Sequence, residues 1–234
     1  MDFNSPIQQP ESQENIKSLK LDLEKTDKEN LLVGYKTNGM KYSVRDHRLR
    51  YFYPDEYMKF FDALKNDQQR LTSDFLINTG ARINEARHVK VADIDWERKN
   101  IMLRKTKVRA KKGERNPKPR TISVSSQFIG RLKKYVRDKS NDEYIGILST
   151  PAFNICLKKA LQTAKIHDWY MFSAHNFRKT HGNWLKALGI DIGEICNRLG
   201  HDYNTYLKDY ASSDIFSFKD KQDMRLILGN LYAR

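Results

Sequence analysis

The chain has 234 residues, which is enough for one large domain or for one domain with a short appendage. Its 43 Lys and Arg residues outnumber 29 Asp and Glu residues and give a net charge of +14, which favours a polyanion such as nucleic acid as the partner. Hydrophobic residues make up 39% of the chain, which excludes wholesale disorder, and no apolar run reaches the roughly 18 residues of a membrane span. Cys156 and Cys196 are too few and too far apart for a disulfide framework or a CxxC zinc site, so we expect reduced, buried thiols.

The first segment, residues 1–53, holds nine Lys or Arg and eight Asp or Glu and is therefore nearly neutral. We expect a disordered leader over 1–13 and a short amphipathic helix over 14–32. The start of the chain lacks the basic-then-apolar pattern of a signal peptide, which predicts that the protein stays inside the cell. Pro54 suits the first position of a helix, so we place a domain boundary before it and a second domain over 54–234.

The second domain is predicted to be mainly α with one small antiparallel β-sheet, an α+β arrangement. Two β-prone segments, Ile101–Leu103 and Thr121–Val124, flank a basic run and are the expected strands. The predicted helices span about 54–65, 68–78, a segment from 82, 126–138, 151–165, 173–188, 191–199, 203–211 and 219–231.

More than half of the excess positive charge lies in the run Arg104–Arg120, which has nine basic residues and one acidic residue. From composition alone, a solvated basic loop explains this run as well as a DNA contact does. The β-prone flanks, together with Gly113 and Asn116-Pro117 as turn residues, favour a hairpin with a cationic tip that enters a DNA groove. The residues of this run that we expect to contact DNA are Arg104, Lys105, Arg109, Lys111, Lys112 and Arg115.

Two helix starts in the second domain carry pairs of polar residues on one face. The pattern TGARINE places Arg82 after a Gly turn, with Glu85 three residues later, and the pattern SAHNFR places His175 and Arg178 three residues apart. Taken singly, the first is better explained by a surface ion pair, and the second is explained equally well by a capped helix with a half-buried histidine.

A third pattern lies closer to the end of the chain. Gly200 ends a predicted helix and is followed by His201, and Tyr210 comes nine positions after that histidine. Tyr210 alone could be a core aromatic residue, and Tyr203 and Tyr206 lie in the same segment, so spacing from the histidine does not choose among the three tyrosines.

In chain order, these patterns resemble the active site of the tyrosine recombinases, the phage integrase family. The resemblance covers residues 54–211 and rests on the TGxRxxE turn, the HxxR helix, the LGH turn and the tyrosine nine positions further on. It implies the family's catalytic-domain fold. The catalytic residues that it implies are Arg82, Lys107, His175, Arg178, His201 and Tyr210, with Glu85 as a supporting residue. Lys105 is the alternative to Lys107, because the register of the hairpin is open.

These residue types suit cleavage of a phosphodiester. Arg82 and Arg178 each offer a guanidinium that bonds two phosphate oxygens at once and stays charged at any working pH. A phenol with an ordinary pKa near 10 needs a neighbour to take its proton, and His175 is the candidate base. The resemblance implies that Lys107 protonates the leaving sugar hydroxyl, and we expect His201 to hydrogen-bond a nonbridging phosphate oxygen.

The resemblance implies a site-specific DNA recombinase or integrase that cleaves and rejoins double-stranded DNA through a covalent 3′-phosphotyrosine intermediate. Such a reaction conserves the bond energy, so we expect no cofactor and no metal. Asp93 and Asp95 form a carboxylate pair that could hold Mg²⁺ from one face of a strand, but a turn is the favoured interpretation of this tract.

An apolar tail follows the last tyrosine, from about residue 212. It either completes the core of its own domain or docks on a neighbouring protomer, which would give a dimer or tetramer on DNA. The 53 residues before the second domain are too few for the full core-binding domain that family members carry. We expect a cytoplasmic, nucleoid-associated protein of prokaryotic, viral or mobile-element origin, with no membrane contact.

Two other functions compete with this interpretation. A type IB topoisomerase-like enzyme would share the nucleophile and the two arginines but would relax DNA without joining partner sites. A noncatalytic DNA-binding module on the same scaffold is the other, and the intact set of candidate residues argues against it.

Overall fold

The structure is a computed structural model, and it describes residues 32–35, 41–44, 50–104, 119–209 and 216–231. The chain divides into two compact units, Met1–His47 and Arg48–Arg234. The second unit therefore begins before Pro54, and residues 50–53, which the sequence analysis assigned to the first segment, belong to it.

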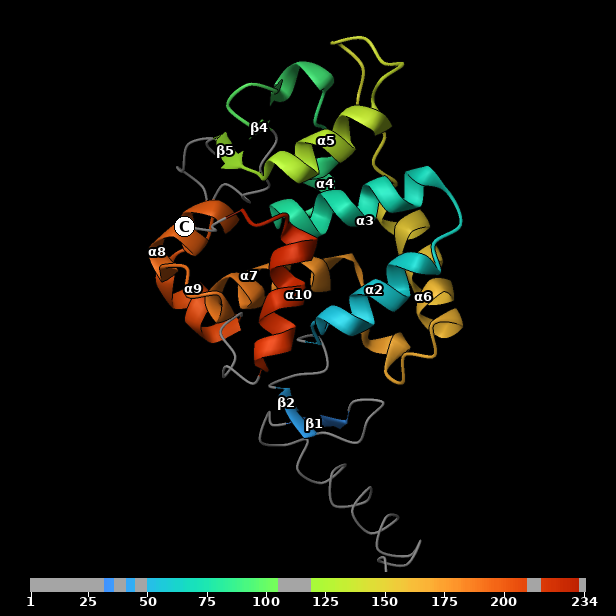
Figure 1. Ribbon diagram of the computed structural model, residues 1–234, viewed down its shortest axis with the longest axis vertical. Coiled ribbons are helices and arrows are strands. Elements are labelled where there is room, and N and C mark those ends of the chain that lie inside the picture. Colours follow the sequence, from blue (N-terminus) through green and yellow to red (C-terminus); the bar gives the residue numbers. More distant parts are fainter. Residues whose placement is uncertain (1–31, 36–40, 45–49, 105–118, 210–215, 232–234) are drawn as a thin grey trace, which may run out of the picture. The chain divides into compact units, whose positions relative to one another are not determined.

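The described part of the first unit is a β-hairpin. Strand β1 (Leu32–Tyr35) pairs antiparallel with β2 (Lys41–Val44) (Figure 1). The sequence analysis did not predict these strands. Of the helix predicted over 14–32, only the last residue lies in the described part of the chain, and it is in β1.

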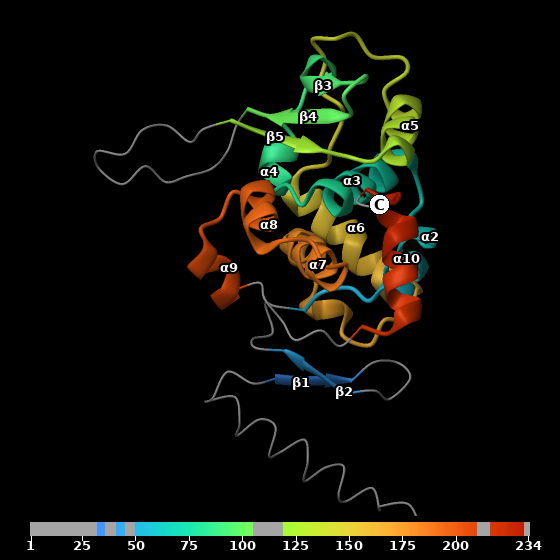
Figure 2. The same ribbon diagram turned by 60° about the vertical axis from the view of Figure 1, so that its left-hand side comes forward.

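The second unit is mainly helical and carries a three-stranded sheet (Figures 1 and 2), so the predicted α+β fold is confirmed. Its α-helices are α2 (Pro54–Asp62), α3 (Asp67–Thr79), α4 (Ile83–Ala86), α5 (Ser126–Tyr135), α6 (Thr150–Thr163), α7 (Ala174–Ala187), α8 (Ile192–Leu199), α9 (Tyr203–Asp209) and α10 (Phe218–Leu228). Its strands are β3 (Ile94–Asp95), β4 (Asn100–Leu103) and β5 (Arg120–Ser123), and its 3₁₀ turns are η3 (Val91–Asp93) and η4 (Trp169–Met171).

The sheet has the order β3-β4-β5 with antiparallel pairing throughout. Ile101 in the central strand lies opposite Ile94 on one side and Ile122 on the other, and all three side chains are buried. The two predicted strands are therefore confirmed, whereas the tract at Ile94 and Asp95 forms an edge strand rather than only a turn. The connection between β4 and β5 is described only at its ends, Arg104 and Pro119.

Helices α3 and α7 pack against each other in the middle of the unit, and the sheet and α5 lie at one end of it (Figure 2). The buried rings of Phe52, Phe60 and Phe177 meet in the core, with ring centroids 5.2 to 5.8 Å apart. Helix α7 is almost wholly buried from Asn176 to Leu185. Buried polar side chains need hydrogen-bond partners, and those of α7 can find them only in neighbouring segments or in a site. Helix α7 is therefore bonded to several parts of the unit.

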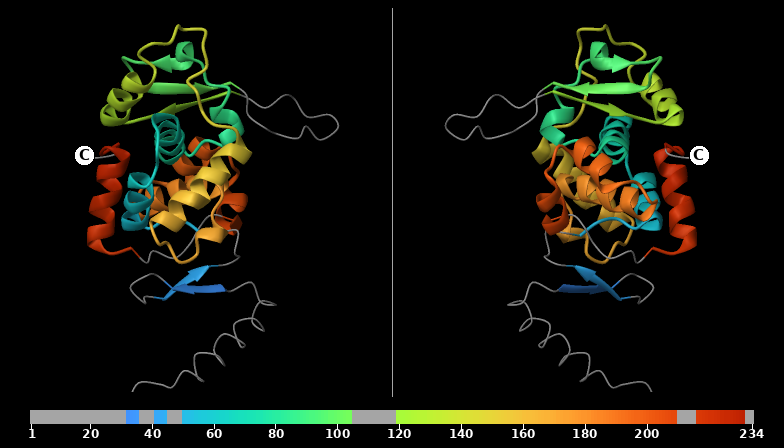
Figure 3. Two further views of the ribbon diagram at one scale, coloured as in Figure 1. Left: turned by 90° about the vertical axis from the view of Figure 1, so that its right-hand side faces the viewer. Right: turned by 90° about the vertical axis from the view of Figure 1, so that its left-hand side faces the viewer.

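The C-terminal helix packs on its own chain. Helix α10 contacts α2, α3 and α7 (Figure 3), and its side chains Met224 and Leu228 are buried. The ring of Phe216, just before the helix, makes a tilted contact with the ring of Tyr51 and an edge-on contact with that of Tyr53. Within the described ranges, no helix has both the length and the apolar character needed to cross a membrane.

Candidate active site

A hollow of about 270 Å³ brings three of the predicted catalytic residues together. Arg82, at the start of α4, and His175 and Arg178, in the first turns of α7, all line it. The remaining lining residues are Ala81, Ile83, Asn84, Thr150, Asn154, Ser173 and Ala174. Arg178 is fully buried, the Arg82 side chain is 30% exposed and His175 is exposed, so the site grades from the core to the solvent.

The buried guanidinium of Arg178 is held by two glycine turns. Its Nη1 donates to the carbonyl of Gly80 (2.8 Å), and its Nη2 donates to the carbonyl of Leu199, just before Gly200. Both glycines have left-handed backbone, with φ of 63° and 62°, which residues with a side chain rarely adopt. The TG and LG pairs of the sequence therefore place two carbonyls around one arginine.

Glu85 is a buried carboxylate that holds two arginines. It accepts from the Arg82 guanidinium (2.9 Å) and backbone N–H (2.9 Å), and from both terminal nitrogens of Arg120 (3.1 and 2.6 Å). Burial alone would raise the pKa of Glu85, but the hydrogen bonds and charge of Arg120, with the Arg82 N–H, lower it to about 2. Glu85 is thus ionised at neutral pH and fixes Arg82 at the edge of the hollow.

Arg120 was not among the predicted site residues. It lies at the start of β5 and is only 13% exposed, and its Nε donates to the carbonyl of Arg198 (3.1 Å). In the sequence it is the last of nine basic residues in the run, so nothing in the composition distinguishes it from the others. The position at the start of a strand, rather than in the turn, is the only signal that could have separated it from the rest.

Arg198 and His181 form a second buried layer that the sequence analysis also missed. Arg198 donates to His181 Nε2 (2.8 Å), to the carbonyl of Ser123 (2.6 Å) and to that of Asn78 (3.0 Å). These bonds join α8 to α7, β5 and α3, just before the turn that carries His201. Because charged residues are rarely buried, no sequence pattern marks an arginine that lies inside the protein.

His201 is the partner of the third donor of Arg178, whose Nε donates to His201 Nε2 (3.2 Å). Burial, and then the charges of Arg178 and Arg82, lower the pKa of His201 to about 3. The imidazole is therefore neutral at pH 7, and because Nε2 accepts, its proton is on Nδ1.

His175 is also neutral at pH 7. Although His175 is exposed as a residue, its place at the hollow partly desolvates the ring, and this desolvation, followed by the charges of Lys179, Arg178 and Arg82, lowers its pKa to about 4. A neutral imidazole can accept a proton. The two histidines respond to the same positive charges, so the hollow is an electropositive site suited to an anion.

The predicted nucleophile and most of the basic run lie outside the described residues. This holds for Tyr210, Lys107 and Lys105 and for the predicted DNA contacts Arg109, Lys111, Lys112 and Arg115. Arg104 is described: it pairs with the buried carboxylate of Asp93 while its own side chain remains 60% exposed.

The carboxylate pair is accounted for by local structure. Asp93 accepts from the N–H of Lys90 (3.0 Å) as well as from Arg104, and Asp95 accepts from the N–H of Arg98 (2.8 Å). Among the described residues, no group of three or more His, Cys, Asp or Glu side chains could hold a metal ion. Of the two cysteines, Cys196 is buried, whereas Cys156 is only half-buried, and both are free.

The two alternative tyrosines differ in exposure. Tyr206 is fully buried, its hydroxyl donates to the carbonyl of Gly182 (3.3 Å), and burial raises its pKa to about 12. Tyr203 is 54% exposed. A phenol that is packed in the core and hard to ionise is a structural residue, so Tyr206 is a poor candidate nucleophile.

Comparison with solved structures places this fold among integrases and recombinases. A crystal structure of XerA recombinase aligns over 76% of this chain and 62% of that chain, with a TM-score of 0.56 and 19% identity. The Tn1549 transposon integrase in complex with a circular intermediate DNA gives 0.56 at 16% identity, over 74% of this chain and 64% of that chain. The XerH recombinase bound to its difH substrate gives 0.52 at 19% identity, over 85% and 60%.

Sequence comparison identifies the family. The model of the phage integrase family matches residues 50–215, so this chain belongs to the phage integrase family. Tyrosine recombinase XerA of Saccharolobus solfataricus is 26% identical over 167 residues, which are 71% of this chain and 51% of that protein. Tyrosine recombinase XerC of Staphylococcus saprophyticus is 25% identical over 178 residues, 67% of this chain and 55% of that protein. The chain thus spans about half the length of these two relatives.

Proposed function

We propose that this chain is a site-specific DNA recombinase that cleaves and rejoins DNA strands through a 3′-phosphotyrosine formed by Tyr210. The observation that carries the proposal is the convergence of Arg82, His175 and Arg178 on one electropositive hollow, with His201 bonded to Arg178. The family supports the reaction class, and the names of its relatives agree with it.

In this proposal, the two arginines bind the scissile phosphate. The guanidinium of Arg82 reaches the hollow from a partly exposed position, and that of Arg178 lies at its buried end. Fixed donors of this kind stabilise the charge that develops on the phosphate oxygens, because they need no reorganisation during the reaction. Glu85 holds Arg82 in place and does not itself react.

The reaction transfers the phosphoryl group from the 5′ oxygen of one nucleotide to the Tyr210 oxygen. The Tyr210 oxygen attacks phosphorus and loses its proton to neutral His175, while the bond to the 5′ oxygen breaks and that oxygen takes a proton from Lys107, or from Lys105. The Nδ1–H of His201 is assigned to a nonbridging oxygen. The attack of a 5′ hydroxyl on the phosphotyrosine reverses these steps and joins strands without a cofactor.

A suicide duplex, nicked so that the 5′ product diffuses away, tests the proposal. We expect wild-type protein to form a covalent complex with this DNA and the Tyr210→Phe variant to form none. The matched control is Tyr206→Phe, which removes a buried hydroxyl at a cost of about 1 kcal/mol and should still trap DNA. Loss of trapping in Tyr203→Phe or Tyr206→Phe, with trapping retained in Tyr210→Phe, would refute the assignment.

The same assay separates the competing functions. Relaxation of a supercoiled plasmid that holds a single site, with no joined products between two sites, would favour a type IB topoisomerase-like enzyme. DNA binding with no covalent complex under any of these conditions would favour a noncatalytic module.

The partner in this proposal is double-stranded DNA in a prokaryotic cytoplasm, with assembly into a dimer or tetramer through the C-terminal tail. Helix α10 buries one face in its own chain, but Phe218 and Leu226 on it are 75% and 64% exposed. Exposed large apolar side chains of this kind are suited to a protein contact. Sedimentation of the protein with and without DNA, compared between wild type and a Phe218→Ser, Leu226→Ser variant, measures this assembly.

A further inference from the structure

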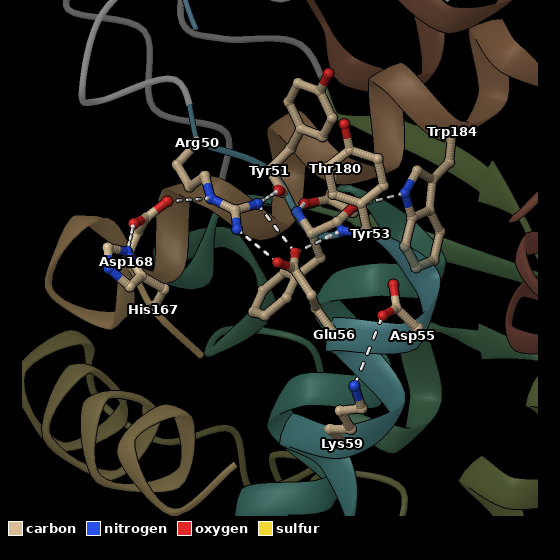
Figure 4. Close-up of polar contacts among 11 residues, drawn as sticks. Arg50, Tyr51, Tyr53, Asp55, Glu56, Lys59, His167, Asp168, Thr180 and Trp184 are labelled. Atoms are coloured by element: carbon tan, nitrogen blue, oxygen red, sulfur yellow. Dashed lines mark hydrogen bonds and ion pairs between the residues drawn. The ribbon is translucent and has the colours of Figure 1, made fainter. Parts of the chain in front are cut away.

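The segment that enters the second unit is attached to the helix that carries the catalytic pair. We call residues 50–52 the latch. The backbone N–H of Phe52 donates to the hydroxyl of Thr180 (3.0 Å), and the indole N–H of Trp184 donates to the carbonyl of Phe52 (2.9 Å). The side-chain amide of Asn176 donates to the carbonyl of Arg50. Figure 4 shows the Thr180 and Trp184 ends of this attachment.

These three α7 residues recur at a spacing of four and therefore lie along one face of the helix. They are all buried, with exposures of 1% for Asn176 and 0% for Thr180 and Trp184. A row of side chains that bonds the backbone of a neighbouring segment fixes its own helix against that segment in translation and in rotation.

The latch is itself anchored by the side chain of Arg50. This guanidinium is 1% exposed and bonds both carboxylate oxygens of Glu56 (2.6 and 3.0 Å), and its Nε lies 3.4 Å from Asp168, which also bonds His167 (Figure 4). It also lies over the ring of Phe172, 4.9 Å from the centroid. A charged group that bonds two carboxylates inside the protein has little freedom to move.

Asn176 connects the latch to the catalytic turn because it stands between His175 and Arg178 in the chain. Its amide oxygen accepts from the backbone N–H (2.8 Å) and the hydroxyl (2.8 Å) of Ser173, while its amide nitrogen donates to Arg50. One side chain thus closes the first turn of α7 and ties that turn to the latch.

We propose that Asn176 is a positioning residue that, through the latch, sets the place of His175 and Arg178 at the scissile phosphate. This inference rests on the proposed function. The rate of a reaction between positioned groups depends strongly on the distance between them, so a misplacement of about 1 Å can lower the rate about a hundredfold. Asn176 does not reach the hollow itself and acts through the first turn of α7.

Single-turnover trapping on the suicide duplex, at saturating protein, tests the inference because it yields two numbers. The amplitude reports the competent fraction, and the rate constant reports the geometry of the competent molecules. The Asn176→Asp variant keeps the oxygen that caps α7 and loses the donor to the latch, and Thr180→Val breaks a second latch bond without adding charge. The matched control is Asn183→Ala, which removes a buried asparagine of the same helix that donates to the carbonyl of Lys179 within α7.

We expect Asn176→Asp to lower the rate constant about tenfold or more, and Thr180→Val to lower it severalfold, both with wild-type amplitude and with half-saturating DNA concentration within about twofold. Asn183→Ala should keep the wild-type rate constant. A wild-type rate constant in Asn176→Asp, or a loss of amplitude alone in both latch variants, overturns the inference. If Asn176→Asp does not fold, Thr180→Val alone tests the inference, and a wild-type rate constant in that variant overturns it. Failure of the wild-type protein to trap DNA would instead refute the proposed function.

Discussion

At the scale of single residues, the site works with neutral histidines in a field of fixed cations. The pKa of His175 is lowered to about 4 and that of His201 to about 3, and Glu85 stays ionised because its pKa is lowered to about 2. Both imidazoles are therefore neutral, and the Glu85 carboxylate is ionised, across the neutral range. Burial is the largest cause of the lowered pKa of both histidines, followed by nearby cations that include Arg178 and Arg82, whereas the hydrogen bonds and charge of Arg120 lower the pKa of Glu85.

This arrangement predicts the pH dependence of cleavage. At subsaturating DNA the rate reports the free protein, so protonation of His175 should cause no decline between about pH 8 and about pH 5.5. The measurement is the trapping rate under these conditions, on protein shown by circular dichroism to be folded. A tenfold decline per pH unit starting near 6.5, absent from His175→Gln, would contradict the predicted pKa.

The lowered pKa values of the histidines also predict how the free energy of unfolding depends on pH. A histidine whose pKa falls on folding takes up its proton more readily in the unfolded chain. Stability should therefore be full above about pH 6.5 and should decline as the pH falls toward 4, as both His175 and the buried His181 resist protonation. This is why the folded state must be checked at each acidic point.

At the scale of elements, turns and helix ends place the site, and these are the features that the sequence predicted best. Gly80 and Gly200 end α3 and α8 as expected, and α3, α5 and α6 begin within one residue of their predicted starts, where Asn66, Ser125 and Ser149 cap them. Short strands were harder. β3 has two residues, which is too few for an alternating pattern, and for the β1–β2 hairpin the sequence analysis missed Asn38-Gly39, a turn dipeptide that lies between the two strands.

The polar interior was the part of the site that the sequence did not reveal. Arg82, His175 and Arg178 belong to short sequence patterns, and the structure places all three around one hollow. Arg120, Arg198 and Arg50 do not, because their importance comes from burial among segments far apart in the chain. Such burial is a property of tertiary packing and has no local periodicity.

The Gly80 turn gives a prediction at this scale. Its φ of 63° is strained for any other residue, and a Cβ there would lie 2.5 Å from Cδ2 of His181. We expect Gly80→Ala to lower the free energy of unfolding by at least about 1 to 2 kcal/mol, measured by urea denaturation.

The control is a glycine of a regular helix. Gly130 lies inside α5 and a Cβ there would meet nothing within 4 Å. Gly130→Ala should therefore raise the free energy of unfolding by about 0.4 to 1 kcal/mol. Equal losses in the two variants would contradict the view that the left-handed turn sets the cost at Gly80.

At the scale of the whole molecule, more than half of the net charge of +14 lies in the run Arg104–Arg120, which we expect to contact DNA. Binding that neutralises phosphates releases counterions, so the logarithm of the binding constant should fall linearly with the logarithm of salt concentration. Lys111 and Lys112 are in the basic run, outside the described residues. We expect a Lys111→Gln, Lys112→Gln variant to reduce the slope by about 1 to 2 without altering trapping at low salt, as measured by fluorescence anisotropy. An unchanged slope would place these lysines away from DNA.

The attachment of residues 50–52 to α7 has a consequence for how the protein can be divided. A fragment that starts at Pro54 would leave Glu56 and Asp168 without Arg50, and Thr180 and Trp184 would each lose a hydrogen bond to the backbone of Phe52. A fragment that starts at Arg48 would retain these contacts. Tension on residue 50 would therefore be transmitted through these bonds to α7, the helix that carries His175 and Arg178.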